Sequence, residues 1–202
     1  MAESAVSEGI SQEEIQKKID EVEYTGRKMG PTLGKVIGLI AASWSLYQLW
    51  IASPLPFLLN FGIIGGVPSR AIHLAFALLL VFLMFPAAKS MAHKSIAKLD
   101  IVFALLGAAV ALYLFVGWAG IVDRSGSLLV WNGIPVEAII GGVGIVLLLE
   151  STRRAIGVPL VIVSILFLTY SIFGQSMPEI ISHRGLSLTR LIGYHWLSLA
   201  RR

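Results

Sequence analysis

Long stretches without a charged residue alternate with short charged segments along most of this chain. The charge-free runs are 36–69, 71–88, 101–122, 138–149 and 155–178. A hydrocarbon core of ~30 Å needs about 20 apolar residues per helix. The pattern therefore predicts an all-α, polytopic helical membrane protein with about five transmembrane helices. Their expected bounds are 36–53, 71–87, 101–122, 135–150 and 159–174.

The segment between the first two predicted helices is apolar but interrupted. Pro54 and Pro56 cannot continue the first helix without breaking its hydrogen bonds. Residues 57–68 are rich in glycine and too short to cross a membrane. We expect an interfacial or re-entrant loop there.

Residues 1–35 form a polar N-terminal segment that holds most of the acidic residues. Ser11 and Glu14 have the spacing of a capping box. An apolar stripe follows the cap at Ile15, Ile19 and Val22. We expect a short amphipathic helix over 11–24, which either touches the membrane surface or serves as a docking helix for another subunit.

Composition supports the membrane class. Of the 202 residues, 56% are hydrophobic and 14% are charged, whereas soluble domains carry about 25% charged residues. The net charge of +4 comes from basic residues near the ends of the predicted helices. That distribution is a topology signal and needs no nucleic acid as partner. The chain has no cysteine, so disulfide and thiol chemistry are excluded.

Basic residues also predict the orientation of the chain. Five Lys or Arg precede the first predicted helix, three lie between the second and third, and two lie between the fourth and fifth. These ten face one side, and the other six face the opposite side. The positive-inside rule then puts the N-terminal segment in the cytoplasm and the tail, 175–202, in the periplasm, where it could lie on the membrane surface.

A charged motif joins the fourth and fifth predicted helices. Glu150 stands three and four residues before Arg153 and Arg154, and Gly157 and Pro159 follow. Those spacings share one helix face, so the carboxylate can pair with either guanidinium. We expect this topology and hairpin motif to keep costly charges at the membrane edge paired.

Two groups of small residues predict close helix packing. They are Ala104, Gly107, Ala108 and Ala111 in the third predicted helix, and Gly141, Gly142 and Gly144 in the fourth. Small residues let helix backbones approach closely inside a membrane. We expect these faces to receive other helices, including those of a separate membrane region.

The sequence offers little for catalysis or cofactor binding. The histidines, His73, His93, His183 and His195, do not pair at one depth as a haem site requires. His183 and His195 have no third zinc ligand nearby. The serines of the predicted helices have no buried base beside them, and Gly141–Gly144 has no lysine to bind phosphate. We therefore expect no enzyme activity, no cofactor and no metal.

Glu137 is the one ionisable residue within a predicted helix that remains a functional candidate. An acid inside a membrane span is a functional hypothesis by default. Glu137 is, however, only two residues past Pro135. The alternative is a structural residue at the membrane interface.

Three separated blocks resemble the fused permeases of tripartite ATP-independent periplasmic (TRAP) transporters, in the subgroup served by TAXI-type binding proteins. The first is the motif from Leu147 to Pro159. The second is 70–76 together with Phe85–Pro86, and the third is 183–185 followed by 188–191. They occur in the order of the family, over about 27–196.

The resemblance implies the N-terminal part of such a permease, which corresponds to the small membrane subunit, in a bacterial inner membrane. In the family a larger permease region follows and binds substrate and coupling ion. Because the chain stops near Trp196, we expect a fragment, a split gene or a frameshifted sequence. The implied partners are the lipid bilayer, the large permease region and a periplasmic TAXI-type binding protein that delivers organic acids.

Two other functions stay open. The chain could be a stand-alone small membrane scaffold that assembles another complex, or a membrane enzyme. The sequence does not indicate the substrate or the coupling ion.

Overall fold

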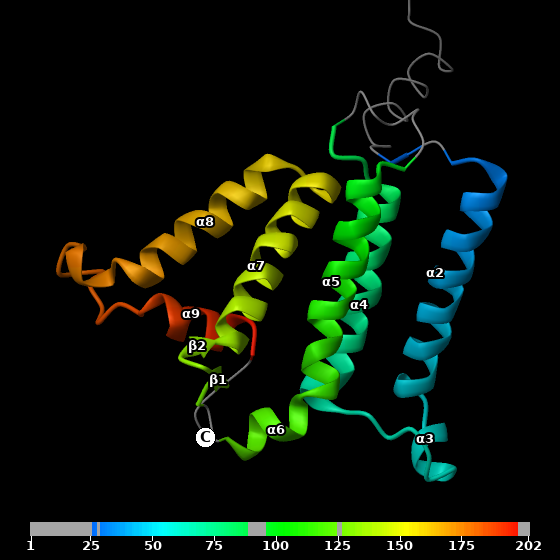
Figure 1. Ribbon diagram of the computed structural model, residues 1–202, viewed down its shortest axis with the longest axis horizontal. Helices are drawn as coiled ribbons and strands as arrows, with labels where there is room; N and C mark the ends of the chain where they lie inside the picture. Colours follow the sequence, from blue (N-terminus) through cyan, green and yellow to red (C-terminus); the bar gives the residue numbers. More distant parts are fainter. Residues whose placement is uncertain (1–25, 28, 89–95, 125–126, 198–202) are drawn as a thin grey trace, which may run out of the picture.

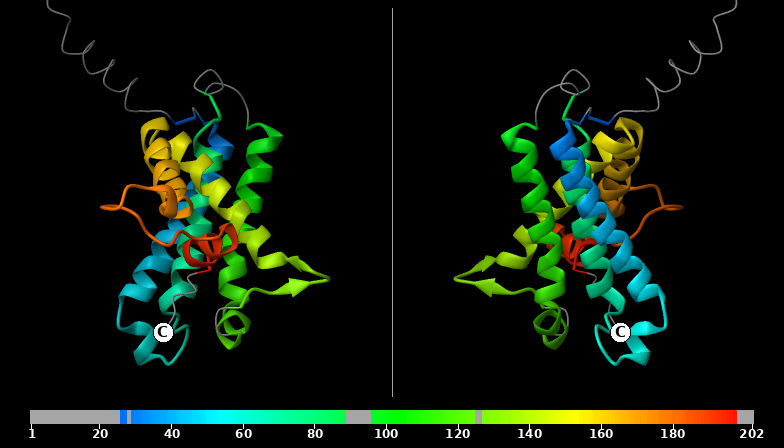
Figure 2. Two further views of the ribbon diagram at one scale, coloured as in Figure 1. Left: turned by 90° about the vertical axis from the view of Figure 1, so that its left-hand side faces the viewer. Right: turned by 90° about the vertical axis from the view of Figure 1, so that its right-hand side faces the viewer.

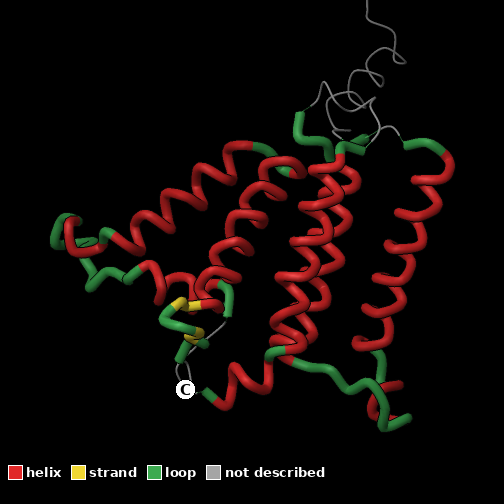
Figure 3. Tube along the Cα trace, viewed as in Figure 1, coloured by secondary structure: helices red, strands yellow, loops and turns green. Residues whose placement is uncertain are grey.

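The computed structural model describes residues 26–27, 29–88, 96–124 and 127–197. The predicted helix over 11–24 and most of the connector after the second predicted helix lie outside these residues. The described chain is mostly helical, with a single pair of very short strands (Figure 3). The prediction of a mainly α-helical chain is therefore confirmed.

Among the described residues, three helices are long and apolar enough to cross a membrane: α2 (Pro31–Ala52), α4 (Gly66–Met84) and α5 (Lys98–Val116). They run alternately down, up and down beside one another, with α7 (Val136–Ala155) next to them (Figure 1). Three of the five predicted spans thus have suitable helices. Membrane crossing by α7 and by the shorter apolar helix α8 (Val158–Ile172) stays a prediction.

Proline and glycine set the helix boundaries. Pro31 follows Gly30 at the start of α2, where its missing N–H costs no hydrogen bond. The helix ends at Ala52, before Pro54. The one-turn helix α3 (Leu55–Leu58) overlaps the start of the predicted loop 57–68, and α4 takes its last residues. Gly157, with φ of +117°, makes the sharp turn between α7 and α8.

Several boundaries differ from the sequence prediction, and α2 and α4 each begin five residues before the predicted start. The apolar run 101–122 is divided at Gly117 into α5 and the short helix α6 (Trp118–Asp123). The continuous hydrophobicity hides this break. In addition, α7 continues through Arg154 to Ala155, so the charged motif lies in helix rather than in a loop.

A β-hairpin between α6 and α7 was not predicted. Strand β1 (Val130–Trp131) pairs antiparallel with β2 (Ile134–Pro135). The turn residues Asn132 and Gly133 both have positive φ, as a two-residue type I′ turn requires. An Asn–Gly pair between apolar residues is a strong hairpin signal, so this element was within reach of the sequence.

The first small-residue face packs inside the chain, against α4. Ala104 and Ala111 are buried, and a Cβ on Gly107 would lie 3.2 Å from the Cβ of Leu78. This contact forms a hydrophobic core between α4 and α5. It consists of Ala75, Leu78, Phe82, Ala104 and Ala111, with Leu147 from α7; Ala108 packs against it.

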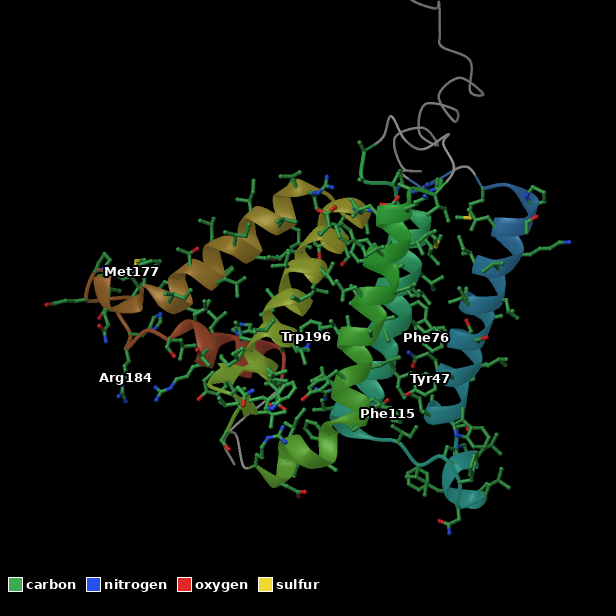
Figure 4. The ribbon with its side chains drawn as sticks, in the orientation of Figure 1. Tyr47, Phe76, Phe115, Met177, Arg184 and Trp196 are labelled. Atoms are coloured by element: carbon green, nitrogen blue, oxygen red, sulfur yellow. The ribbon has the colours of Figure 1, made fainter. Side chains whose placement is uncertain are left out.

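The second small-residue face is covered by α9 (Leu188–His195), which follows α8 and the 3₁₀ turn η2 (Gly174–Ser176). Trp196, at the end of α9, lies beside α7 (Figure 4). A Cβ on Gly144 would overlap the Trp196 indole, and one on Gly141 would meet Ile192. Both small-residue faces are therefore occupied by this chain, and a separate membrane region must use another surface.

The neighbouring glycines of α7 allow a matched test of this packing. Gly144→Ala puts a methyl group into the rigid indole ring of Trp196, whereas a Cβ on Gly142 meets only Ile192 Cδ1 at 3.6 Å. We expect Gly144→Ala to lower the free energy of unfolding by about 1–3 kcal/mol. Gly142→Ala should leave it unchanged or raise it by up to about 1 kcal/mol, because alanine favours helix.

Unfolding in detergent micelles measures both variants, and protease cleavage within 175–197 reports release of α9. Equal stability of the two variants would contradict the packing of α9 on the glycine face.

Candidate functional site

A network of charged side chains joins four segments at the end of the bundle where α2 begins and α7 ends. Glu150, Arg153 and Arg154 come from the last turns of α7. Asp100 comes from the first turn of α5, and Arg27 precedes α2. The predicted hairpin motif is thus one part of a larger cluster.

Glu150 accepts hydrogen bonds from both neighbouring arginines. Arg153 donates through Nε to Oε2 at 2.7 Å and through Nη2 to Oε1 at 2.8 Å. Arg154 donates through Nε to Oε1 at 2.7 Å. The sequence spacing predicted pairing with either arginine, and the helix lets both pair at once.

Arg154 is the centre of the network. Its Nη1 donates to Asp100 Oδ1 at 2.8 Å and to the carbonyl of Phe85 at 3.3 Å. The guanidinium carbon lies 5.0 Å from the ring centre of Phe82 and 5.7 Å from that of Phe103. The side chain is 1% exposed, so these contacts replace water around a buried cation.

Arg27 attaches the N-terminal segment to the same carboxylate. Its Nη2 donates to Asp100 Oδ2 at 2.6 Å, and its backbone N–H donates to the carbonyl of Met84 at 2.7 Å. Both side chains are buried. Asp100 therefore holds two arginines that are distant in sequence, and the end of α4 contributes backbone acceptors to both.

Helix polarity favours this arrangement. Asp100 lies in the first turn of α5, where a negative charge is favourable, and Arg153 and Arg154 lie in the last turn of α7, where positive charge is favourable. Arg153 lies past the apolar part of α7. The hydrogen bonds that it donates to Glu150 raise the pKa of its guanidinium above the usual value. The guanidinium is therefore charged at every physiological pH.

Glu137 occupies a second buried polar site, at the opposite end of α7. It has no exposed surface and accepts hydrogen bonds from the Tyr113 hydroxyl at 2.9 Å and from the Leu129 N–H at 2.9 Å. Arg124 forms an ion pair with it. These contacts fasten α5, α6 and the hairpin to the start of α7. A functional role for Glu137 stays a prediction, and the contacts described here give it a structural role.

The histidines within the described residues have local partners. His73 of α4 contacts Gln48 and the Trp44 ring of α2. His183 Nε2 lies 3.1 Å from the Tyr170 carbonyl, and His195 Nδ1 lies 2.9 Å from the carbonyl four residues before it. In the described part of the chain no three His, Asp or Glu gather as metal ligands.

Sequence reasoning missed the long-range half of the charge network. It did not connect Asp100 with any arginine, and it counted Arg27 only among the basic residues of the N-terminal segment. The partners of Asp100 are 54 and 73 residues away, so no local spacing indicates them. A usable signal is that an acid and two arginines all stand at the same predicted membrane edge.

The charged side chains of the network are paired with one another where the helices meet. This arrangement holds the helices together and presents no unpaired reactive group among the residues named here. Comparison of this chain with protein-family models, with curated proteins and with solved structures found no match.

Exposure distinguishes the two arginines of the motif in a mutational test. Arg154→Ala removes the buried bridge between Asp100 and Glu150, and we expect a loss of about 3 kcal/mol or more in unfolding free energy. Arg153 is 39% exposed, so Arg153→Ala should cost at most about 1 kcal/mol.

Unfolding of the purified variants in detergent measures the difference. Equal losses for the two substitutions would contradict the central position of Arg154.

Proposed function

We propose that this chain is a membrane component of a TRAP-type permease, namely its N-terminal scaffold part rather than the transport core. In this proposal it lies in a bacterial inner membrane, with the N-terminal segment in the cytoplasm. It works with a large permease region and with a periplasmic TAXI-type binding protein that delivers organic acids.

The observation that carries the proposal is the place of the Glu150–Arg153–Arg154 motif. This motif is one of the three blocks that resemble these permeases, and its Arg154 is the centre of the buried network that joins α4, α5 and α7. A family motif with that role supports a structural part whose function is to hold helices in fixed positions.

The distribution of polar groups favours a scaffold over a transport core. Secondary transporters bind substrate near the middle of the membrane, on broken helices with polar groups. The two buried ion-pair sites described above lie at opposite ends of α7. Between them, the contacts among α4, α5 and α7 in the described residues are made by apolar side chains such as Leu78, Leu147 and Val110.

Topology gives a direct prediction in this cysteine-free chain. Ser95 lies in the connector predicted in the cytoplasm and Ser187 in the tail predicted in the periplasm, so a single cysteine at each position reports one side of the membrane. An impermeant thiol reagent added to intact cells should label the Ser187→Cys variant and spare Ser95→Cys, and both should react after lysis. Labelling of Ser95→Cys alone would reverse the proposed orientation.

Reconstitution tests the scaffold function. Vesicles receive this chain, the large permease region or both, together with the binding protein and an inward sodium gradient. The transported compounds are organic acids that the binding protein has first been shown to bind. We expect no uptake above that of empty vesicles with this chain alone, and uptake when both membrane parts are present.

Two results would contradict the proposal in different ways. Sodium-driven uptake by this chain alone would overturn the scaffold assignment. Failure of the large region to co-purify with it in mild detergent would overturn the assignment to a permease and favour the stand-alone scaffold.

A further inference from the structure

The β1–β2 hairpin extends sideways from the helices, near the end of the bundle where α6 lies (Figure 2). The long axes of α4 and α5 run vertically in the same view, so the hairpin lies roughly across them (Figure 2). If those helices cross a membrane, the hairpin lies along its surface at one edge of the apolar layer.

The side chains of the hairpin are apolar and uncovered. Trp131 is 72% exposed, Val130 56% and Ile134 53%. The stretch 127–136 contains no charged residue. A projecting apolar tip of this kind, when surrounded by water, would be an aggregation hazard, so it indicates another environment.

The hairpin is held in a defined direction. The Leu129 N–H donates to the buried Glu137 carboxylate at 2.9 Å, and Leu128 packs against the core formed by α4, α5 and α9. Asn132 and Gly133 adopt the positive φ values of a tight turn. The exposed side chains are therefore presented by a fixed base.

A second apolar element lies at the same end of the bundle, on the opposite side. Helix α3 and the residues after it expose large apolar side chains, namely Leu55, Phe57, Leu58, Leu59, Phe61 and Ile63. Figures 1 and 2 both place α3 and the hairpin on opposite sides of the helices. A protein partner covers one side of a molecule, whereas a lipid layer surrounds it at one level.

We infer that the β1–β2 hairpin is a lipid anchor that inserts Val130, Trp131 and Ile134 at the boundary between headgroups and acyl chains. Tryptophan is enriched at this level of the membrane because its ring is apolar and its N–H can bond to polar groups. Two short strands leave backbone groups unpaired on their outer edges, so the hairpin stays at the interface and does not enter the hydrocarbon.

This inference does not depend on the transport function. It requires only that α2, α4 and α5 lie in a membrane. Because the hairpin carries no charge, zwitterionic lipid is sufficient for the interaction.

Depth-dependent quenching tests the anchor. An environment-sensitive fluorophore is attached to single cysteines of the full chain at Ile134, at Leu105 as an exposed mid-helix reference in α5, and at Asp123 as an exposed charged reference in α6. The proteins are reconstituted in phosphatidylcholine vesicles with nitroxides either near the headgroup or deep in the acyl chains. Aqueous iodide reports contact with water.

We expect the probe at Ile134 to be quenched several-fold more by the shallow nitroxide than by the deep one, and to be shielded from iodide. The Leu105 probe should prefer the deep nitroxide, and the Asp123 probe should respond to iodide. Iodide quenching at Ile134 equal to that at Asp123 would overturn the inference. So would shielding that appears only after another protein is added.

Substitution of Trp131 adds a second measurement. Trp131→Glu puts a charge at the lipid boundary and should raise iodide quenching of the Ile134 probe several-fold. Trp131→Tyr keeps an interfacial aromatic ring and should leave the quenching unchanged. An equal response of the two variants would mean that Trp131 does not hold the hairpin in lipid.

Discussion

The fold depends on the pairing of the buried Arg154 guanidinium with two carboxylates, the buried one of Asp100 and the partly exposed one of Glu150. Removing an ion from water costs several kcal/mol, and the cost is recovered only when the partners have good geometry and few polar atoms are left over. Arg154 meets both conditions through Asp100, Glu150 and the Phe85 carbonyl. Because those acceptors lie in α5, in α7 and directly after α4, these helices cannot separate without leaving a buried charge without its partners.

Small residues make this junction possible. The buried network needs the end of α4 and the start of α5 to be close enough for one guanidinium to reach both. Gly107 permits that distance, since its position has room for no large side chain against Leu78. Small residues have another role on α7, where Gly141 and Gly144 make room for the side chains of Ile192 and Trp196 rather than for a long helix. The α4–α5 packing and the ion pairs are therefore interdependent.

Local geometry explains which features the sequence could predict. The pairing of Glu150 with its arginines follows from helix spacing, and the helices α2, α4 and α5 follow from apolar length. The break at Gly117 was missed because the sequence is hydrophobic on both sides of it. The packing of α9 on α7 was missed because a tryptophan that fills a glycine groove leaves no periodic signal in the sequence. The partnership of Arg27 with Asp100 depends on tertiary structure alone. The β1–β2 hairpin was also missed, although the Asn132–Gly133 pair is a local sequence signal that indicates it.

If α7 crosses a membrane, as the sequence predicts, its two buried charged residues constrain how deep the bundle lies in the bilayer. Glu137 and Arg154 are seventeen residues apart on one helix, or about 26 Å at 1.5 Å per residue. That separation is close to the ~30 Å thickness of a hydrocarbon core. Each charged site can then lie at one membrane edge while the apolar contacts of α4, α5 and α7 fill the interval. In that placement a shift of α7 along its axis would bring one ion-pair site into hydrocarbon, so the contacts that join the helices would also fix their depth.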